Sequence, residues 1–270
     1  MIDSSGLADV NGARLYYEIE GNGTPLVLIH GRGLDTRMWD DQVAAFAAKY
    51  CVIRYDVRAF GKSSLPSDVP FRHADDLHAL LQHLGVDRAH VVGLSMGGRI
   101  AVDFALLYPE SALSLILVDA SLDGVDYSDA WNESLDAIGE RARLEGPRAG
   151  NEMWLAHELF APAREQSACG AKLARIVGDS SGWIWLHATP LQPIVPPAAD
   201  RLHELHVPAL VVVGERDLSD FQRIADTLAT GIDGARKVVL RGAGHMSNME
   251  QPDEFNAAVL DFLDDVGDNA

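Results

Sequence analysis

The chain has 270 residues, of which 47% are hydrophobic and 23% charged, as expected for a globular protein with a large core. Its 22 basic and 40 acidic residues give a net charge of −18, which disfavours nucleic acid and anionic membranes as partners and favours a neutral small-molecule substrate. No segment approaches the roughly 20 apolar residues that span a bilayer, and the first residues lack a signal-peptide pattern. We therefore expect a cytoplasmic protein.

The first elements in chain order form a predicted hairpin, because Asn11-Gly12 is a turn signal between Leu7–Val10 and the alternating segment Arg14–Ile19. Short and nearly continuous apolar runs follow, a pattern typical of strands buried on both faces of a parallel sheet. These runs are Leu26–Ile29, Val52–Tyr55, Ala89–Leu94, Leu115–Val118, Ala209–Val213 and Val238–Leu240. Together with the hairpin they predict an α/β protein with a doubly wound, mostly parallel sheet of eight strands.

Segments with helical spacing lie between these strands. Leu77, Leu80, Leu81 and Leu84 follow the i, i+3, i+4, i+7 spacing of one buried helix face. The alternation of strand and helix stops in residues 122–198, which contain helix-like segments, four of the five tryptophans and a cluster of prolines. We therefore predict a core made of residues 1–121 and 199–270, and a helical cap or lid inserted as residues 122–198.

Ser95 lies between the apolar run Ala89–Leu94 and a helical segment, within Gly93-Leu94-Ser95-Met96-Gly97. A G-x-S-x-G segment between a strand and a helix is typical of a nucleophile elbow, in which the serine stands on a tight turn. The glycines fit such a turn, because a side chain two positions before or after the serine would strike a neighbouring strand or helix. The pattern predicts Ser95 as the nucleophile.

A serine nucleophile needs a base, and the base needs an acid that orients it. His245 follows the last predicted strand in a glycine-rich loop, and Asp217 follows the strand before it, so both are expected at the same sheet edge as Ser95. The chain order Ser, Asp, His is that of the hydrolase fold and differs from the chymotrypsin and subtilisin orders. Asp119, which follows another strand, and Asp220 remain rival acids.

His30-Gly31-Arg32-Gly33 follows an earlier strand, at the position where a hydrolase needs its second oxyanion donor. The backbone N–H groups of Arg32 and Met96 are expected to hold the negative charge that develops on the substrate oxygen. The Arg32 side chain has two alternatives. It either lines the pocket mouth, where it would meet a substrate carboxylate or carbonyl, or it points to solvent.

Five segments occur in a characteristic order: His30-Gly31-x-Gly33, Tyr55-Asp56-x-Arg58-x-x-Gly61-x-Ser63, Gly93-x-Ser95-Met96-Gly97-Gly98, Gly214-x-x-Asp217 and Gly244-His245. In these segments the chain resembles the α/β-hydrolase superfamily, in the branch that contains carboxylesterases, enol-lactonases and cofactor-free haloperoxidase-like enzymes. The resemblance runs from the first hairpin to the last helix. One departure is Ala59, where the family usually has glycine. Serine at position 95, rather than aspartate, disfavours haloalkane dehalogenase and epoxide hydrolase chemistry.

The resemblance implies a serine esterase or lactonase that forms an acyl-enzyme on Ser95, with His245 as base and Asp217 as acid, and that uses neither a cofactor nor a metal. In this branch the insertion is a lid above the nucleophile, which makes three of its tryptophans candidates for lining an apolar acyl pocket. These are Trp154, Trp183 and Trp185.

Several alternatives to ester hydrolysis stay open. The same scaffold supports C–C bond hydrolysis, perhydrolysis and acyl transfer to an acceptor other than water. A protein of a different class, a ligand receptor that keeps the triad and turns over slowly, is the main rival. We expect a small neutral ester or lactone as the partner, while the natural substrate and the oligomeric state, a homo-oligomer included, are left open by the sequence.

Overall fold

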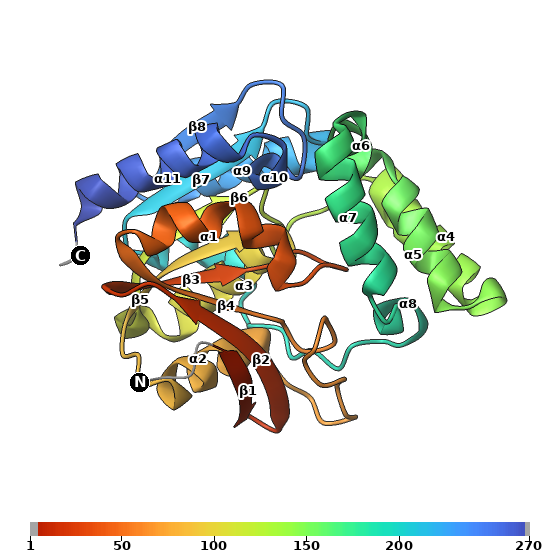
Figure 1. Ribbon diagram of the computed structural model, residues 1–270, viewed down its shortest axis with the longest axis horizontal. Helices are drawn as coiled ribbons and strands as arrows, with labels where there is room; N and C mark the ends of the chain where they lie inside the picture. The colour runs from red at the N-terminus through yellow and green to blue at the C-terminus, as the bar shows by residue number, and fades with distance from the viewer. Residues whose placement is uncertain (1–4, 268–270) are drawn as a thin grey trace.

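The computed structural model describes residues 5–267 and is built around an eight-stranded sheet in the order β1-β2-β4-β3-β5-β6-β7-β8 (Figure 1). The strands are β1 (Ser5–Val10), β2 (Ala13–Glu20), β3 (Thr24–Ile29), β4 (Tyr50–Tyr55), β5 (Ala89–Leu94), β6 (Ala112–Val118), β7 (Ala209–Gly214) and β8 (Arg236–Leu240). The β1–β2 and β2–β4 pairs are antiparallel, and the remaining pairs are parallel. The predicted doubly wound, mostly parallel sheet is confirmed.

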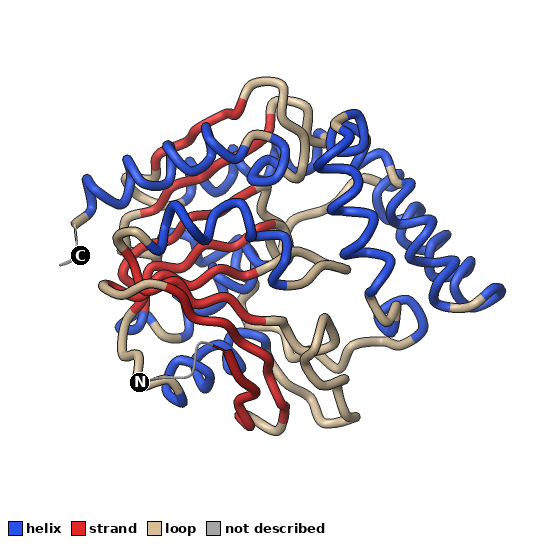
Figure 2. The backbone as a smooth tube through the Cα atoms, viewed as in Figure 1, coloured by secondary structure: helices blue, strands red, loops and turns tan. Residues whose placement is uncertain are grey.

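Helices cover both faces of the sheet, as Figure 2 shows by the blue segments on either side of the red strands. On one face lie α1 (Asp40–Ala47) and α11 (Pro252–Val266); on the other lie α2 (His73–His83), α3 (Met96–Leu107) and α9 (Ser219–Gly231). The leucines predicted to form one helix face are all buried on or next to α2. Within the described part of the chain, no helix is both long and apolar enough to cross a bilayer.

The core is divided by the sheet into two clusters, and successive strand residues enter them alternately. In β5, Val91 belongs to the cluster under α2 and α3, whereas Val92 belongs to the cluster under α1 and α11. Val211 and Val212 of β7 divide in the same way. Because neighbouring side chains of a strand point to opposite faces, a strand covered on both sides needs an apolar residue at every position. This arrangement explains the uninterrupted apolar runs of the sequence.

Five helices follow β6 and precede β7, and Figure 1 shows them in green beyond the carboxyl ends of the strands. They are α4 (Asp129–Glu145), α5 (Pro147–Ala156), α6 (Ala161–Glu165), α7 (Ser167–Asp179) and α8 (Trp183–Leu186). The remaining short elements are α10 (Ser247–Glu250) and the 3₁₀ turns Thr36–Trp39, Pro109–Ser111, Glu158–Phe160 and Ala198–Glu204. The helices between β6 and β7 are therefore placed to cover the edge at which ligands bind in open α/β sheets.

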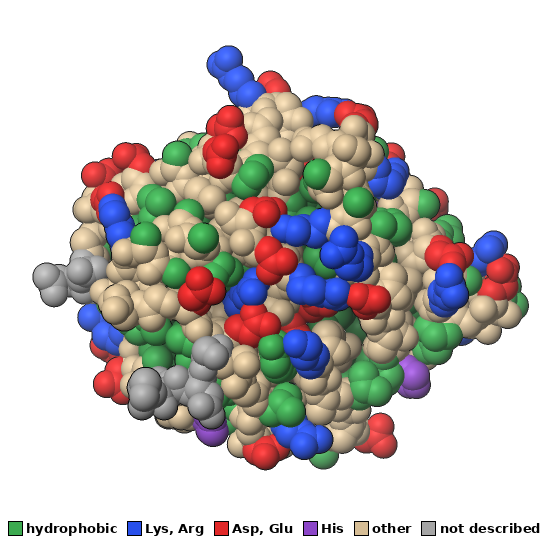
Figure 3. Space-filling view, in the orientation of Figure 1, with side chains coloured by type: hydrophobic (Ala, Val, Ile, Leu, Met, Phe, Trp, Pro, Cys, Tyr) green, Lys and Arg blue, Asp and Glu red, His purple; other side chains and the backbone are tan. Residues whose placement is uncertain are grey.

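Acidic and basic side chains lie next to one another over much of the face shown in Figure 3. Lys49 pairs with Asp264 at 2.8 Å, and Arg236 pairs with Asp265 at 2.9 Å. Pairs as exposed as these contribute little to stability, typically about 0.2–1 kcal/mol. They nevertheless place both basic residues beside carboxylates.

Candidate active site

Ser95 stands on a strained turn between β5 and α3, with φ of +55° and ψ of −114°. The turn is held from both sides, because the Ser95 N–H donates to the Val118 carbonyl at 2.9 Å and the Ser121 N–H donates to the Ser95 carbonyl at 3.0 Å. A non-glycine residue with positive φ persists only where the surrounding structure fixes it. The Ser95 side chain is thereby held at the carboxyl edge of the sheet.

The two glycines around Ser95 are required by space. A Cβ added to Gly93 would lie 2.1 Å from the carbonyl oxygen of Gly97, and one added to Gly97 would lie 2.2 Å from the carbonyl oxygen of Ile29. Both distances are far below any van der Waals contact. The crowding expected from the sequence is thus present, and it explains why the strand and the helix meet so closely at the nucleophile.

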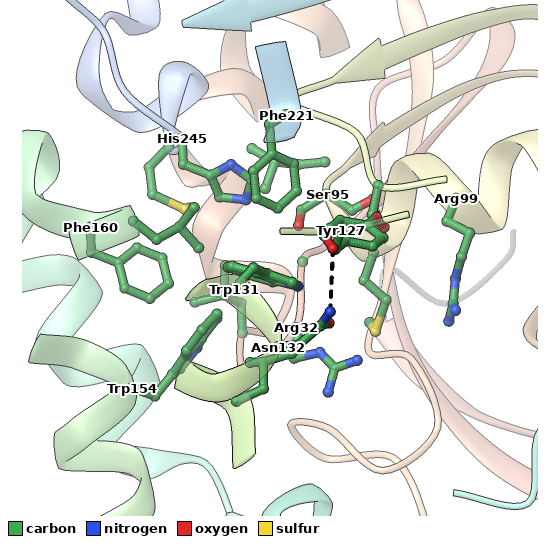
Figure 4. A pocket seen from close by; sticks show the side chains of 18 of the residues that line it. Arg32, Ser95, Arg99, Tyr127, Trp131, Asn132, Trp154, Phe160, Phe221 and His245 are labelled. Atoms are coloured by element: carbon green, nitrogen blue, oxygen red, sulfur yellow. Dashed lines mark hydrogen bonds between the residues drawn. The ribbon is translucent and has the colours of Figure 1, made fainter. Parts of the chain in front are cut away.

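His245 and Asp217 lie together beneath the same cavity that Ser95 lines. The His245 Nδ1–H donates to Asp217 Oδ2 at 2.9 Å, and both side chains are buried. Asp217 Oδ1 accepts the N–H of Leu218 at 2.7 Å, which fixes the carboxylate. With Nδ1 engaged, Nε2 of His245 is the nitrogen left for the nucleophile, and Figure 4 shows the imidazole and Ser95 lining one cavity. The structure therefore brings the three predicted residues together.

Asp119 also lies beside this pair. Single ligand atoms of Asp119, Asp217 and His245 all lie within 4.8 Å of one another. Asp119 accepts hydrogen bonds from the Gly214 N–H at 2.7 Å and from the Ser247 hydroxyl. Burial, and next the Asp217 carboxylate, raise the pKa of Asp119 well above its usual value, and burial also raises the pKa of Asp217. Two adjacent buried carboxylates favour a state with one proton between them.

These three side chains are the one group in residues 5–267 whose His, Cys, Asp or Glu ligand atoms come close enough to hold a metal ion. All four of their carboxylate oxygens already accept hydrogen bonds from N–H or O–H donors of the protein. A bound cation would have to displace several of these donors. The geometry fits a hydrogen-bonded acid pair behind an imidazole better than a set of metal ligands.

Asp220, the other rival acid, is bound elsewhere. It accepts the Ser128 hydroxyl at 2.6 Å and pairs with Arg223 at 2.9 Å. The Ser128 side chain in turn accepts the N–H of Trp131 and so caps α4. Asp220 therefore ties α9 to the first of the five inserted helices, and it does not orient the imidazole.

The loop that carries His245 is held by Glu250, a residue that is not predicted from the sequence. The two Glu250 carboxylate oxygens accept the N–H groups of Gly244 at 2.6 Å and Met246 at 3.1 Å. Burial lowers the pKa of His245 to about 4, although Asp119 and Glu250 act in the opposite direction. The imidazole is therefore neutral near pH 7, as a base must be. Nothing in the sequence distinguishes Glu250 from the many other acidic residues.

The structure places Arg32 and Met96, the two predicted oxyanion donors, in the lining of the cavity that contains Ser95. Arg32 follows β3, and Met96 is the first residue of α3, whose positive dipole end favours negative charge. Within residues 5–267, no protein acceptor takes the N–H of either residue. Two free donors at the nucleophile are what an oxyanion hole requires.

The cavity has a volume of about 240 Å³, and much of its wall is aromatic. Figure 4 shows Trp131, Trp154, Phe160 and Phe221 around His245, and the Phe221 ring centroid lies 4.3 Å from that of His245. Of these, only Trp154 is predicted from the sequence. The others come from α4, α9 and the 3₁₀ turn Glu158–Phe160, whose orientations no local pattern reveals.

The structure places the two other tryptophans predicted for the pocket, Trp183 and Trp185, in α8. As far as residues 5–267 define the cavity, its lining includes neither of them. Trp185 packs behind Trp154 with ring centroids 5.6 Å apart, and its Nε1–H donates to Asn151 at 2.8 Å. Trp183 stacks on His187 with centroids 4.7 Å apart. Trp185 thus packs α8 against α5, and Trp183 packs against the residue that follows α8.

Known proteins share this architecture. A family described as "alpha/beta hydrolase fold" matches residues 24–252. The 2-hydroxy-6-oxononadienedioate/2-hydroxy-6-oxononatrienedioate hydrolase of Paraburkholderia phymatum is 33% identical over 266 residues, which cover 93% of this chain and 91% of that protein. RutD of Pseudomonas savastanoi pv. phaseolicola, named as a candidate carbamate hydrolase, is 32% identical over 253 residues, 88% of this chain and 93% of the relative.

Among solved structures, the enol-lactonase from Burkholderia xenovorans superposes with a TM-score of 0.82 and 30% sequence identity, over 96% of this chain and 100% of that one. The fold, the order of the motifs and the matched length all agree with the resemblance found in the sequence. The chain belongs to the α/β-hydrolase family.

Proposed function

We propose that this protein is a serine hydrolase that cleaves a carboxylic ester or a lactone. The observation that carries the proposal is the hydrogen bond of 2.9 Å between His245 and Asp217 beneath the cavity that Ser95 lines. The strained turn at Ser95 supports it, because such strain persists at sites where it serves function. The enol-lactonase structure is a neighbour with this class of substrate in its name.

The reaction has two steps. In the first, His245 Nε2 takes the Ser95 proton as Oγ attacks the carbonyl carbon, and the N–H groups of Arg32 and Met96 stabilise the oxyanion. The intermediate collapses, the bond to the leaving oxygen breaks, and His245 returns the proton to that oxygen. In the second, His245 takes a proton from water, which attacks the acyl-enzyme, and the acid is released as Ser95 regains its proton. Asp217 stabilises the imidazolium in both steps.

We propose that residues 122–198 act as the lid of this site, over a core of residues 1–121 and 199–270. Trp131 and Trp154 of the inserted helices line the cavity, so these helices shape the space for the substrate. An apolar wall also keeps bulk water from the imidazole and strengthens the electrostatic interactions at the nucleophile.

Replacement of Ser95 tests the proposal. Ser95→Ala should lower the turnover of p-nitrophenyl butyrate by at least about 10⁴-fold, with an unchanged circular dichroism spectrum. Ser121→Ala is the matched control, since Ser121 lines the same cavity with its hydroxyl donated to the Ser95 carbonyl at 3.1 Å; it keeps the nucleophile and the backbone bond to that carbonyl, and should retain measurable turnover. A fluorophosphonate should label Ser95 and no other residue. Turnover that survives in Ser95→Ala, or labelling of another serine, would overturn the proposal.

Hydrolysis of a carbon–carbon bond or of a carbamate is the second candidate. It is favoured by the names of the Paraburkholderia and Pseudomonas relatives, which match nearly the whole chain. Both reactions use an attack on a carbonyl carbon, so the site described above serves them too. Product identification on a panel of esters, lactones, carbamates and β-diketones distinguishes them by kcat/KM. A single slow turnover with a ligand-dependent rise in Tm would instead indicate a receptor.

A further inference from the structure

Arg32 lines the cavity that contains Ser95 and also a neighbouring hollow whose walls include Asp136 and Arg143, and Figure 4 shows its guanidinium among the side chains that line the cavity. In the described range 5–267, no carboxylate forms an ion pair with this guanidinium and no acceptor hydrogen-bonds to it. Two other arginines of low exposure are paired: Arg58 with Asp76 at 2.6 Å, and Arg99 with Asp123 at 3.0 Å. Arg32 differs from them in lacking a protein partner.

Arg32 is partly buried, and a partly buried guanidinium without a partner loses some of its water without gaining an opposite charge. Burial, and next repulsion from Arg99, lower the pKa of Arg32 to about 10. The group is still protonated near neutral pH, so it carries its full charge while a substrate binds. An anion beside Arg32 would supply the missing partner and relieve the repulsion between the two guanidinium groups.

The other charges around the cavity leave Arg32 uncompensated. Asp123 and Arg99 both line the cavity and neutralise each other, and His245 is neutral because burial lowers its pKa. The buried Nε of Arg99 also has no hydrogen-bond partner within residues 5–267. The cavity therefore has a positive end and an unused donor, even though the whole chain has a net charge of −18.

We propose that the substrate of this site carries a carboxylate and that the Arg32 guanidinium binds it, with Arg99 close by. The proposal rests on ester or lactone hydrolysis at Ser95 and names the class of substrate. The backbone of Arg32 offers an oxyanion donor while its side chain offers the cation, so one residue positions both ends of the substrate. The carboxylate must then lie within the length of one arginine side chain from the scissile carbonyl. A short monoester of a dicarboxylic acid has this form.

Matched ester pairs test the proposal near neutral pH. The first pair is p-nitrophenyl hydrogen adipate and its methyl ester, which place or mask a carboxylate in the acyl part. The second is 4-acetoxybenzoate and 4-acetoxybenzamide, which do the same in the leaving group. In at least one pair, kcat/KM should favour the carboxylate by roughly 10-fold or more, because charge-assisted hydrogen bonds are the strong ones.

Arg32→Met should reduce this preference by about 10- to 100-fold, and Arg32→Gln serves as a second variant if the first does not fold. Each ratio compares two substrates on one variant, so any loss of rate caused by a change in the oxyanion donors affects both substrates and cancels in the ratio. Arg236→Met removes one charge at an exposed site outside the cavity and should keep the wild-type ratio. The same ratio in wild type and in the Arg32 variants, or a wild-type preference for the neutral ester in both pairs, would overturn the proposal.

Binding measurements separate a failure of this inference from a failure of the proposed function. If the wild-type protein cleaves none of the four esters, ester hydrolysis fails, and the carboxylate site is judged by Tm alone. Adipate should then raise Tm more than adipamide in the wild type and in Arg236→Met, and not in Arg32→Met. Equal shifts with the two compounds in the wild type would overturn the carboxylate site. Turnover of the neutral esters through Ser95, without a preference for the carboxylate, would support ester hydrolysis and overturn only the proposal that Arg32 binds a substrate carboxylate.

Discussion

Replacing Asp217 and Asp119 in turn by asparagine separates the roles of the two buried carboxylates beside His245. An amide at position 217, where Oδ2 accepts the imidazole N–H at 2.9 Å, can neither fix the tautomer as well nor stabilise the imidazolium. Asp217→Asn should therefore lower kcat/KM by about 10³- to 10⁴-fold, as expected for the loss of a triad acid. At about 1.4 kcal/mol for each factor of ten, this is about 4–5.5 kcal/mol of transition-state stabilisation.

Asp119→Asn should cost less than about 10-fold, roughly the net contribution of one hydrogen bond. Asp119 is bonded to the Gly214 N–H and the Ser247 hydroxyl, and its raised pKa favours the protonated, uncharged form that asparagine resembles. Initial rates of p-nitrophenyl butyrate hydrolysis and the Tm of each folded variant provide the measurements. A larger loss in Asp119→Asn than in Asp217→Asn would refute this reasoning and make Asp119 the acid of the triad.

Three further predictions follow from single contacts. Gly97→Ala places a Cβ 2.2 Å from the Ile29 carbonyl oxygen, and it should lower the free energy of unfolding, measured in urea, by at least about 2 kcal/mol. In the control Gly178→Ala, the added Cβ meets nothing within 4 Å, and the free energy of unfolding should not fall. Burial lowers the pKa of His245 from 6.5 to about 4, so the imidazole stays neutral in mild acid. The fall of kcat/KM on the acidic side of its pH profile should therefore lie below pH 6.5. A fall above that pH would contradict the assignment of His245 as the base. Glu250→Gln offers one acceptor instead of two to the N–H groups of the residues on either side of His245, so kcat/KM should fall by about 10-fold and Tm should also fall. An unchanged kcat/KM would show that the two hydrogen bonds to Glu250 are not needed for catalysis.

The strands and the nucleophile turn could be predicted because their causes are local. The apolar run Ala89–Leu94 coincides with β5, since burial on both faces demands an apolar residue at every step. The turn at Ser95 is marked by glycines that its own backbone geometry requires. The order of strands in the sheet then brings Asp217 and His245 to the edge where Ser95 stands. At these positions, the residue types seen in the sequence are the ones that the three-dimensional structure requires.

The lining of the cavity could not be predicted, because it depends on how short helices pack against one another. Trp131 reaches the site because Asp220 of α9 binds the residue that caps α4, a contact between segments about 90 positions apart. Trp185 has the same side chain but faces Asn151 and the back of Trp154. Tryptophan content alone therefore gives no information on which ring meets a substrate.

The net charge of −18 disfavours an anionic substrate, whereas the Arg32 guanidinium favours one. The distance of each charge from the bound substrate decides which effect is larger. Surface charges are largely screened beyond a Debye length of about 8 Å at physiological salt. Inside an enclosed cavity the effective dielectric constant is lower, so the nearest unpaired charge outweighs a larger number of distant ones. The acidic surface then opposes the approach of an anion, while Arg32 favours it once it is bound. We infer that substrate selectivity depends on the local charge of the cavity, which the total charge of the chain does not predict.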